Sequence, residues 1–301
     1  RDMWDLDAIS QLRHEREFSA VLPSGSPPKI GSTNILFVLY GDFTSNSANH
    51  VAAFANELIS RGFDCIVAVP HHMETIGSQS QARFLGIEFA DLEQLPSYYR
   101  DGRAPALVHA WTTRESVRQF CAAVVAKFAS QVVIHLEDNE REILSRSLQC
   151  DWAELTTKTA DELDELVPSS LAHPIYAEEF LRSAQGVTVI VDQLAEFVPP
   201  PVPHATIWPA ASTAFSPRPP HPEMRRRLGI PVTDTVLFYH GNVHQANAEE
   251  VGELYRAVAQ LTANGTPTWL VRTGRDSPAF TASLDAVTRS RVLEIGFVKR
   301  P

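Results

Sequence analysis

The fold is decided by the stretch NILFVLYGDFTSNSANHVAAFANELISRGFDCIVAVP, residues 34–70. Residues 34–40 form an apolar run that is typical of a strand buried on both faces of a parallel sheet. A polar loop at 41–50 leads into apolar residues at helical spacing, which stop before Gly62, a residue suited to a left-handed helix C-terminus. Residues 64–70 are apolar again, so the stretch predicts a β-α-β unit.

Both halves of the chain repeat this alternation of apolar runs and amphipathic segments. Strands that alternate with helices of ten or more residues indicate parallel sheets joined by right-handed crossovers. We therefore predict an α/β fold with two Rossmann-like lobes. The expected strands of the first lobe are 34–40, 64–70, 106–110, 132–136, 186–192 and 204–208, and those of the second lobe are 235–242, 268–276 and 291–297.

A proline-rich segment at 216–222 separates the halves, because prolines stiffen a connection and resist incorporation into a sheet. This boundary gives a complete first lobe at 33–216 and a partial second lobe at 217–301. Residues 1–32 end in a stretch with linker composition, and acidic helical material at 139–184 interrupts the first lobe. Because the sequence starts with arginine and its end resembles a strand and turn that lead onwards, we expect part of a longer polypeptide.

Composition excludes several classes of function. The formal net charge of −10 disfavours a general binder of nucleic acid or anionic membranes, because such binding needs clustered Lys and Arg. No apolar run approaches the roughly 20 residues that cross a bilayer, so we expect no transmembrane segment. The three cysteines are widely spaced, which predicts neither a zinc site nor a disulfide framework and favours a reducing, cytoplasmic location.

The segment VVIHLEDNERE, residues 132–142, ends a strand-like run with a histidine and several carboxylates. The residues alone leave three readings: a metal site, a catalytic cluster, or a strand followed by a capped helix. The metal site is the weakest reading, since the segment supplies too few clear ligands. Asp138 or Asn139 is suited to cap the following helix, with Glu140 and Glu142 near the positive end of its dipole.

Eight segments follow one another along the chain: 61–70, 107–116, 133–140, 187–198, 205–219, 226–243, 270–274 and 292–298. Their ordered series resembles the retaining glycosyltransferases of family 4, which have the two-lobed GT-B fold. The resemblance covers most of residues 33–301 and rests on an ordered series of segments. It implies that the first lobe holds an acceptor, a glycan or small molecule, and that the second holds a UDP-, GDP- or ADP-linked sugar, usually without a catalytic metal or other cofactor.

By this resemblance His135 is the candidate catalytic residue, because family members place a histidine at the end of this strand, close to the transferred sugar. Its imidazole could hydrogen-bond a sugar hydroxyl or stabilise an oxocarbenium-like transition state. The alternative is a histidine that its buried neighbours satisfy. The other candidates for the acceptor side of the cleft are Gly41, Ser47, Asn49, His109 and Asp138, of which His109 is equally suited to the core.

The second lobe departs from the family pattern, in which an Arg and a Lys after the first strand hold the donor diphosphate. Asn242 and Asn247 stand near those positions, and hydrogen bonds from neutral amides are about half as strong as charge-assisted ones. Arg272, which ends a strand, is the preferred substitute. The remaining candidates for donor binding are Gly241, His244, Gly274 and Arg275.

Three functions are compatible with these observations. The first is a retaining glycosyltransferase, either by itself or as one module of a carbohydrate-assembly protein. The second is a degenerate, non-catalytic module that still binds a glycan or partner, which the two asparagines favour. The third is another enzyme of the same fold, such as a nucleotide-sugar epimerase. Since the paired-glutamate motif of the family has no counterpart up to residue 301, we expect little activity from this stretch alone.

Overall fold

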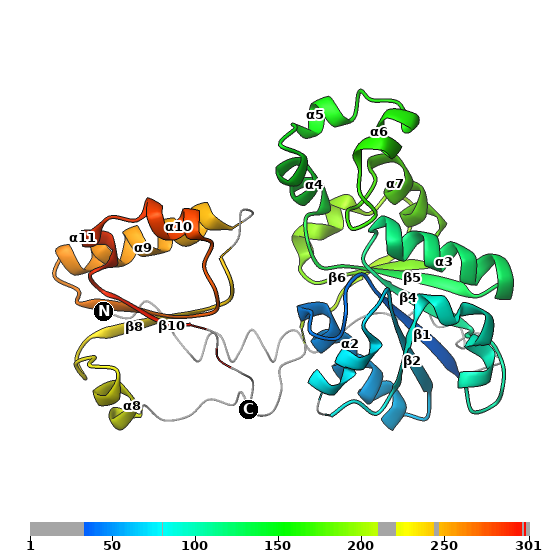
Figure 1. Ribbon diagram of the computed structural model, residues 1–301, viewed down its shortest axis with the longest axis horizontal. Helices are drawn as coiled ribbons and strands as arrows, with labels where there is room; N and C mark the ends of the chain where they lie inside the picture. Colours follow the sequence, from blue (N-terminus) through cyan, green and yellow to red (C-terminus); the bar gives the residue numbers. More distant parts are fainter. Residues whose placement is uncertain (1–32, 80, 210–220, 244–246, 297, 299–301) are drawn as a thin grey trace.

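The computed structural model describes residues 33–79, 81–209, 221–243, 247–296 and 298. These residues form two separate parallel sheets, each with its own hydrophobic core (Figure 1). The α/β fold expected from the sequence is therefore confirmed. The extension at 1–32 and all but the last two residues of the proline-rich segment 216–222 lie outside the described residues.

The larger sheet consists of seven parallel strands. They are β1 (Asn34–Leu39), β2 (Asp64–Val69), β3 (Leu85–Glu88), β4 (Leu107–Trp111), β5 (Gln131–Leu136), β6 (Gly186–Val189) and β7 (His204–Thr206). The spatial order is β3-β2-β1-β4-β5-β6-β7, with every residue of the central β1 buried. The order reverses between β1 and β4, and ligands of such sheets bind outside the carboxyl ends of the strands at this switch point.

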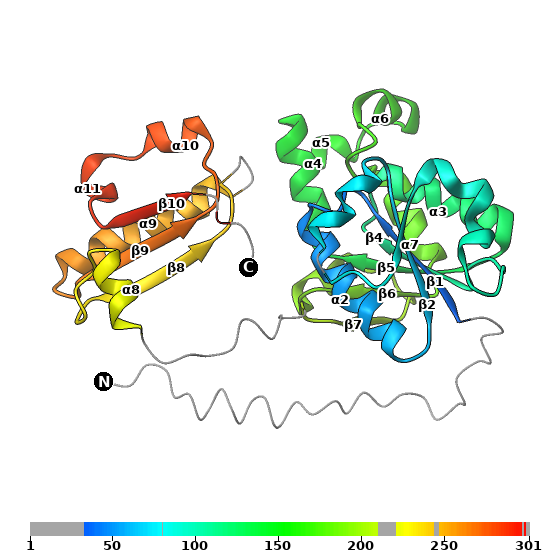
Figure 2. The same cartoon turned by 60° about the horizontal axis from the view of Figure 1, so that its bottom comes forward.

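Helices cover both faces of the larger sheet (Figures 1 and 2). On one face, α2 (Asn46–Ser60) packs Val51 and Ala55 against Phe37 and Leu39. Full burial of a valine, leucine or phenylalanine side chain contributes about 1.5–3 kcal/mol to folding stability. The core of the other face includes residues from α3 (Glu115–Phe128), α7 (Pro174–Ser183), η2 (Phe89–Tyr98) and η3 (Asp192–Phe197), while η1 (Met73–Ser78) lies near β3.

Four helices, the last of them α7, separate β5 from β6. The other three are α4 (Glu140–Leu148), α5 (Trp152–Leu155) and α6 (Ala160–Leu166). They build a small core of their own from Leu144, Leu155, Leu163 and Val167. The group therefore forms a compact unit that begins directly after β5.

The smaller sheet has the order β10-β9-β8, also parallel. Its strands are β8 (Thr235–His240), β9 (Thr268–Thr273) and β10 (Val292–Gly296), and its helices are α8 (Pro222–Arg227), α9 (Ala248–Ala263), α10 (Pro278–Ser283) and α11 (Ala286–Arg289). The long helix α9 packs Val251, Tyr255 and Val258 against the sheet. No helix in the described part of the chain is long and apolar enough to span a membrane.

Candidate functional site

Polar side chains gather at the carboxyl edge of the larger sheet, where β1, β4 and β5 end. Arg114 lies at the centre of this group: its Nε donates to both carboxylate oxygens of Glu140, at 3.0 and 3.2 Å, and its guanidinium lies 3.9 Å from the Tyr40 ring centroid. Asp138 is 3.9 Å from its Nη2, and Gly41 follows β1 at the same edge. Because Arg114 and Glu140 are largely buried, they fix the loops after β4 and β5 to each other.

Helix α2 begins at this edge and brings one of the predicted residues into it. Ser45 caps the helix through its hydroxyl, and the buried Ser47 donates a short hydrogen bond to Glu137. Asn49 is used locally instead, since its Nδ2 donates to the backbone oxygen of Ser45 and its Oδ1 accepts from Gln79. Ser47 therefore belongs to the polar edge, whereas Asn49 supports the loop before the helix.

Glu137 is a buried carboxyl group at this edge that the sequence pattern alone did not mark as a candidate. Burial raises the pKa of Glu137 to about 7, an effect that the hydrogen bond from Ser47 opposes. The neighbouring carboxylate of Asp138 raises the pKa further, and Arg114 lowers it. A carboxyl group with a pKa near neutrality can accept a proton from a ligand hydroxyl or return one to it.

The structure corrects the expectation that His135 lines an open cleft. Its ring is 1% exposed, and the indole of Trp111 stacks on it with 4.1 Å between ring centroids. Its Nδ1 lies 2.7 Å from Oγ1 of Thr188, while its buried Nε2 has no hydrogen-bond partner among the described residues. A sugar therefore does not reach this imidazole in the conformation described.

His109 is part of the core. Its ring is 8% exposed and lies 5.4 Å from the ring of Phe37 and 5.7 Å from that of Trp111 between centroids. Of the two readings that the sequence left open, the structure therefore selects the core residue. Burial lowers the pKa of His109 to about 4, and burial is also the main cause that lowers the pKa of His135 to about 3.

These two histidines predict acid sensitivity. In the unfolded chain each takes up a proton near pH 6.5, but the folded protein keeps both neutral to a much lower pH, so folding stability falls as the pH drops below 6.5. Replacing His135 by Asn removes one of these groups. Between pH 6 and 4 we expect the variant's free energy of unfolding to fall less steeply than the wild type's, by about 1.4 kcal/mol per pH unit.

Urea unfolding at a series of pH values measures this slope. Glu137 affects the pH dependence in the opposite direction, because its raised pKa increases folding stability as the pH falls below about 7. Both proteins contain Glu137, so this effect cancels in the comparison. His204→Asn, a change at an exposed histidine, is the matched control and should leave the slope unchanged. Equal slopes for wild type and His135→Asn would show that the buried ring is not held neutral.

A pocket of about 200 Å³ opens beside Asp138. The cap of α4 is Asn139, whose side chain accepts from the backbone N–H of Glu142 at 3.1 Å, so Asp138 is not needed for capping and remains half-exposed. The wall of the pocket comes from α4, α5, α7 and η3, and includes Arg141, Trp152, His173, Glu196 and Phe197. This pocket is therefore a candidate ligand site of the first lobe.

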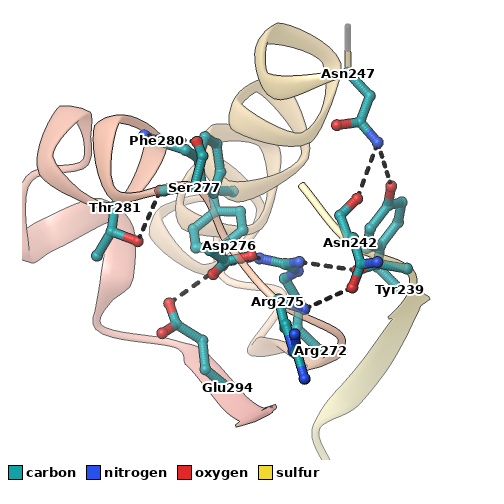
Figure 3. Close-up of polar contacts among 12 residues, drawn as sticks. Tyr239, Asn242, Asn247, Arg272, Arg275, Asp276, Ser277, Phe280, Thr281 and Glu294 are labelled. Atoms are coloured by element: carbon teal, nitrogen blue, oxygen red, sulfur yellow. Dashed lines mark hydrogen bonds and ion pairs between the residues drawn. The ribbon is translucent and has the colours of Figure 1, made fainter. Parts of the chain in front are cut away.

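In the second lobe, the structure corrects the expectation that Arg272 reaches into a cleft. Its side chain is 2% exposed, and its Nη1 donates to Asp276 at 2.6 Å and to the hydroxyl of Tyr255 at 3.0 Å (Figure 3). Its Nη2 donates to the backbone oxygen of Gly241 at 3.2 Å. The charge of Arg272 is neutralised within the lobe, so this residue holds the loops together and does not take the place of the Arg and Lys in the family 4 pattern.

The loops after β8 and β9 lock onto each other. The side-chain oxygen of Asn242 accepts from the backbone N–H of Arg275 at 2.8 Å, and Nδ2 of Asn247 donates to the backbone oxygen of Asn242 at 3.1 Å (Figure 3). Gly274 has a φ of +110°, and a Cβ there would lie 2.2 Å from the backbone oxygen of Gly241. The predicted residues are thus brought together, except His244, which lies outside the described residues.

Among the described residues, the carboxyl edge of the smaller sheet carries little positive charge for a diphosphate. The first turn of α9 contains Glu249 and Glu250, which oppose the favourable interaction of a helix N-terminus with an anion. Arg275, in the loop after β9, is an exposed basic residue at this edge. Neither edge has a ready metal site either, because the described residues contain no group of three or more His, Cys, Asp or Glu side chains that could hold an ion.

Glu137 and Arg114 are the site residues that the sequence analysis missed. Glu137 lies two residues after His135, and in a strand-like segment that spacing places two side chains on one face. Arg114 follows the strand 107–111 in the same way that Asp138 follows the strand ending at Leu136. Because parallel strands end at a common edge, this shared position was the signal that could have identified both residues.

Comparisons with known proteins agree with the fold. No family model and no curated protein sequence matches the chain. Solved structures do: Anabaena Alr3699/HepE in complex with UDP and glucose is 13% identical, with a TM-score of 0.56 over 88% of this chain and 69% of that one. A glycosyltransferase from Rickettsia africae ESF-5 is 12% identical, with a TM-score of 0.54 over 89% and 69%. Arabidopsis thaliana UGT89C1 complexed with quercetin is 12% identical, with a TM-score of 0.51 over 88% and 69%. The chain shares the two-sheet α/β fold of these proteins.

Proposed function

We propose that this protein is a glycosyltransferase that moves a sugar from a nucleotide-sugar donor to an acceptor held by the first lobe. The observation that carries the proposal is the shared fold with Alr3699/HepE, which covers 88% of this chain and whose structure contains UDP and glucose. The site is consistent with this role, because polar side chains and the pocket lie at the carboxyl edge of the larger sheet, where ligands of such sheets bind.

The proposal assigns different tasks to the two lobes. In the first lobe, Glu137 and Ser47 would orient an acceptor hydroxyl, and the near-neutral pKa of Glu137 would let it exchange a proton there. In the second lobe, the locked loops would present backbone groups and Arg275 to the donor diphosphate. The acceptor oxygen bonds to the anomeric carbon as the bond to the diphosphate breaks, with retention of configuration by the family 4 resemblance and no metal required.

A second candidate, a non-catalytic binding module, is favoured by the chemistry of the second lobe. Asn242 and Asn247 replace the family's bases and are engaged in contacts within the lobe. The charge of Arg272 is balanced by Asp276, and two glutamates begin α9. A donor diphosphate would therefore meet fewer positive charges here than the family pattern provides, which would weaken binding first and transfer with it.

Calorimetric titration of the full chain with UDP, GDP and ADP tests the proposal. We expect at least one of them to bind with a Kd below about 1 mM, which corresponds to about −4 kcal/mol. The Arg275→Met variant should bind it about tenfold more weakly, because a charge-assisted hydrogen bond to phosphate is lost. Arg256→Met, which changes an exposed arginine of α9 paired with Glu253 at 2.8 Å, is the matched control.

The outcomes separate the two candidates. If none of the three nucleotides binds, the glycosyltransferase proposal is abandoned. Binding without sugar transfer to any acceptor of a glycan panel would select the binding module. Where transfer is observed, the anomeric configuration of the product, read by NMR, decides whether the reaction retains or inverts it.

A further inference from the structure

The pocket beside Asp138 contains an arginine that aromatic rings hold in place. The guanidinium carbon of Arg141 lies 5.0 Å from the ring centroid of Trp152 and 5.0 Å from that of Phe197. All three side chains line the pocket, and they come from α4, α5 and η3. Contacts with two rings restrict the guanidinium without using its five N–H donors, which remain available to a ligand.

Arg141 differs from the other arginines around this pocket in having no carboxylate partner. Arg114 is paired with Glu140 at 3.0 Å, Arg146 with Glu142 at 2.6 Å and Arg182 with Glu178 at 2.6 Å. For Arg141, no carboxylate of the described residues lies within 4.0 Å, and its recorded contacts are the two rings alone. The pairings of its neighbours also occupy most of the carboxylates that line the pocket, which leaves its positive charge uncompensated at short range.

The rest of the lining fits a ligand with one charged group and several hydroxyls. Glu196 is exposed on the same wall and offers carboxylate oxygens that accept from hydroxyl groups. Trp152 and Phe197 offer apolar faces, and Leu136 and Pro174 complete an apolar lining. The planar guanidinium of arginine matches a carboxylate or phosphate with two parallel hydrogen bonds, which a neutral sugar does not provide.

We propose that this pocket selects an acceptor that carries an anionic group, a carboxylate or a phosphate, and that Arg141 binds that group while the rings of Trp152 and Phe197 contact the apolar face of the same molecule. The assignment of this ligand as the acceptor rests on the function proposed above, but the anion site itself does not. Because Asp138 and Glu140 line the same pocket, the other end of the molecule would lie near the carboxyl edge of β5.

Binding of three matched sugars to the full chain, without nucleotide, tests this proposal. Glucuronate presents a carboxylate, glucose 6-phosphate presents a phosphate, and glucose presents neither. Calorimetry gives the affinities, and the fluorescence of Trp152 gives a local signal that Trp152→Phe removes. We expect at least one anionic sugar to bind about tenfold or more tightly than glucose, and the stronger of the two identifies the anion.

Variants locate the site. Arg141→Met should weaken binding of the preferred anionic sugar by about tenfold or more and leave the affinity for glucose unchanged, because only the charge-assisted bonds are lost. Arg146→Met is the matched control, since this arginine lies on the same helix, is paired with Glu142 and is not among the residues that line the pocket. The far-ultraviolet circular dichroism of both variants should match that of the wild type.

The inference would be overturned if glucose bound as tightly as both anionic sugars, or if Arg141→Met bound the anionic sugars as tightly as the wild type does. Failure to detect binding of any of the three at concentrations up to about 10 mM would also overturn it. These results are independent of the nucleotide titration. A protein that binds glucuronate through Arg141 but no nucleotide keeps the anion site and loses the glycosyltransferase proposal, whereas the reverse result keeps the enzyme and loses the anion site.

Discussion

Replacement of Arg272 by methionine is expected to destabilise the second lobe by about 3–5 kcal/mol, because removing one partner of a buried ion pair leaves an uncompensated charge. The guanidinium is 2% exposed and Asp276 is 16% exposed, so the carboxylate would lose its partner without gaining full hydration. The change also removes donors to Tyr255 and to the backbone oxygen of Gly241. Methionine keeps much of the side-chain volume, so the lost polar contacts dominate the effect.

Hydrogen exchange in a urea series is the suitable measurement, because the two lobes need not unfold together. Amides of β8 and β9 should exchange at a lower urea concentration in Arg272→Met, while amides of β1 and β4 keep their wild-type protection. Arg256→Met is the control for loss of an exposed pair and should change stability by less than about 1 kcal/mol. A loss of similar size in both variants would mean that the buried pair contributes no more than an exposed one.

Much of the fold could be predicted because several of its strands are continuous apolar runs. The residues of β1, at 34–39, are apolar apart from the first and lie in the interior of the sheet, so the pattern and the burial agree. The strand β3, at 85–88, and the short helices η1 and η2 were not predicted. The strand has four residues, one of them glycine, and η1 contains few apolar positions, so too little pattern was available for either. The helix η2 does repeat apolar residues at every third position, at Phe89, Leu92, Leu95 and Tyr98, but this is the period of a 3-10 helix and not the α-helical spacing used for the other helices.

The position of the candidate site could be predicted, but the accessibility of its residues could not. His135 does stand at the end of β5, yet whether its ring faces solvent depends on Trp111, which lies 24 residues earlier in the sequence and packs on it in the sheet. Arg272 likewise ends β9, but Tyr255 from α9 and Asp276 from the next loop surround it. Sequence spacing shows which edge a residue occupies, while burial is decided by residues distant in the chain.

The corrected role of Arg272 changes how the donor side of the site is understood. Its contacts do not reach outward but connect the end of β8, the loop after β9 and α9. Asn242 adds a further link through the backbone N–H of Arg275. A ligand at this edge would therefore meet a preorganised backbone, which reduces the ordering cost of binding. The loops after β8 and β9 also approach each other closely at Gly274, which leaves no room for a side chain there.

Substitution of Gly274 by alanine is expected to cost about 3 kcal/mol or more, for two reasons that add. The backbone φ of +110° is rarely adopted by residues with a Cβ, and the new atom would lie 2.2 Å from the oxygen and 2.5 Å from the carbon of the Gly241 carbonyl. Backbone atoms cannot move aside as a flexible side chain would, so the loops after β8 and β9 must separate and strain the contacts of Arg272.

Gly265→Ala is the matched control, because Gly265 also has a positive φ, +86°, but has nothing within 4 Å of the added Cβ. It should cost only the backbone strain, about 1 kcal/mol. The measurement is the urea midpoint for exchange of β8 and β9 amides, compared between the two alanine variants. The difference isolates the clash from the strain, so equal midpoints would show that the loops are not packed as closely as their backbone distances indicate. If the loops are packed this closely, nucleotide binding should also weaken in Gly274→Ala and not in Gly265→Ala. Only the change at Gly274 disturbs the edge of the sheet that would hold the donor.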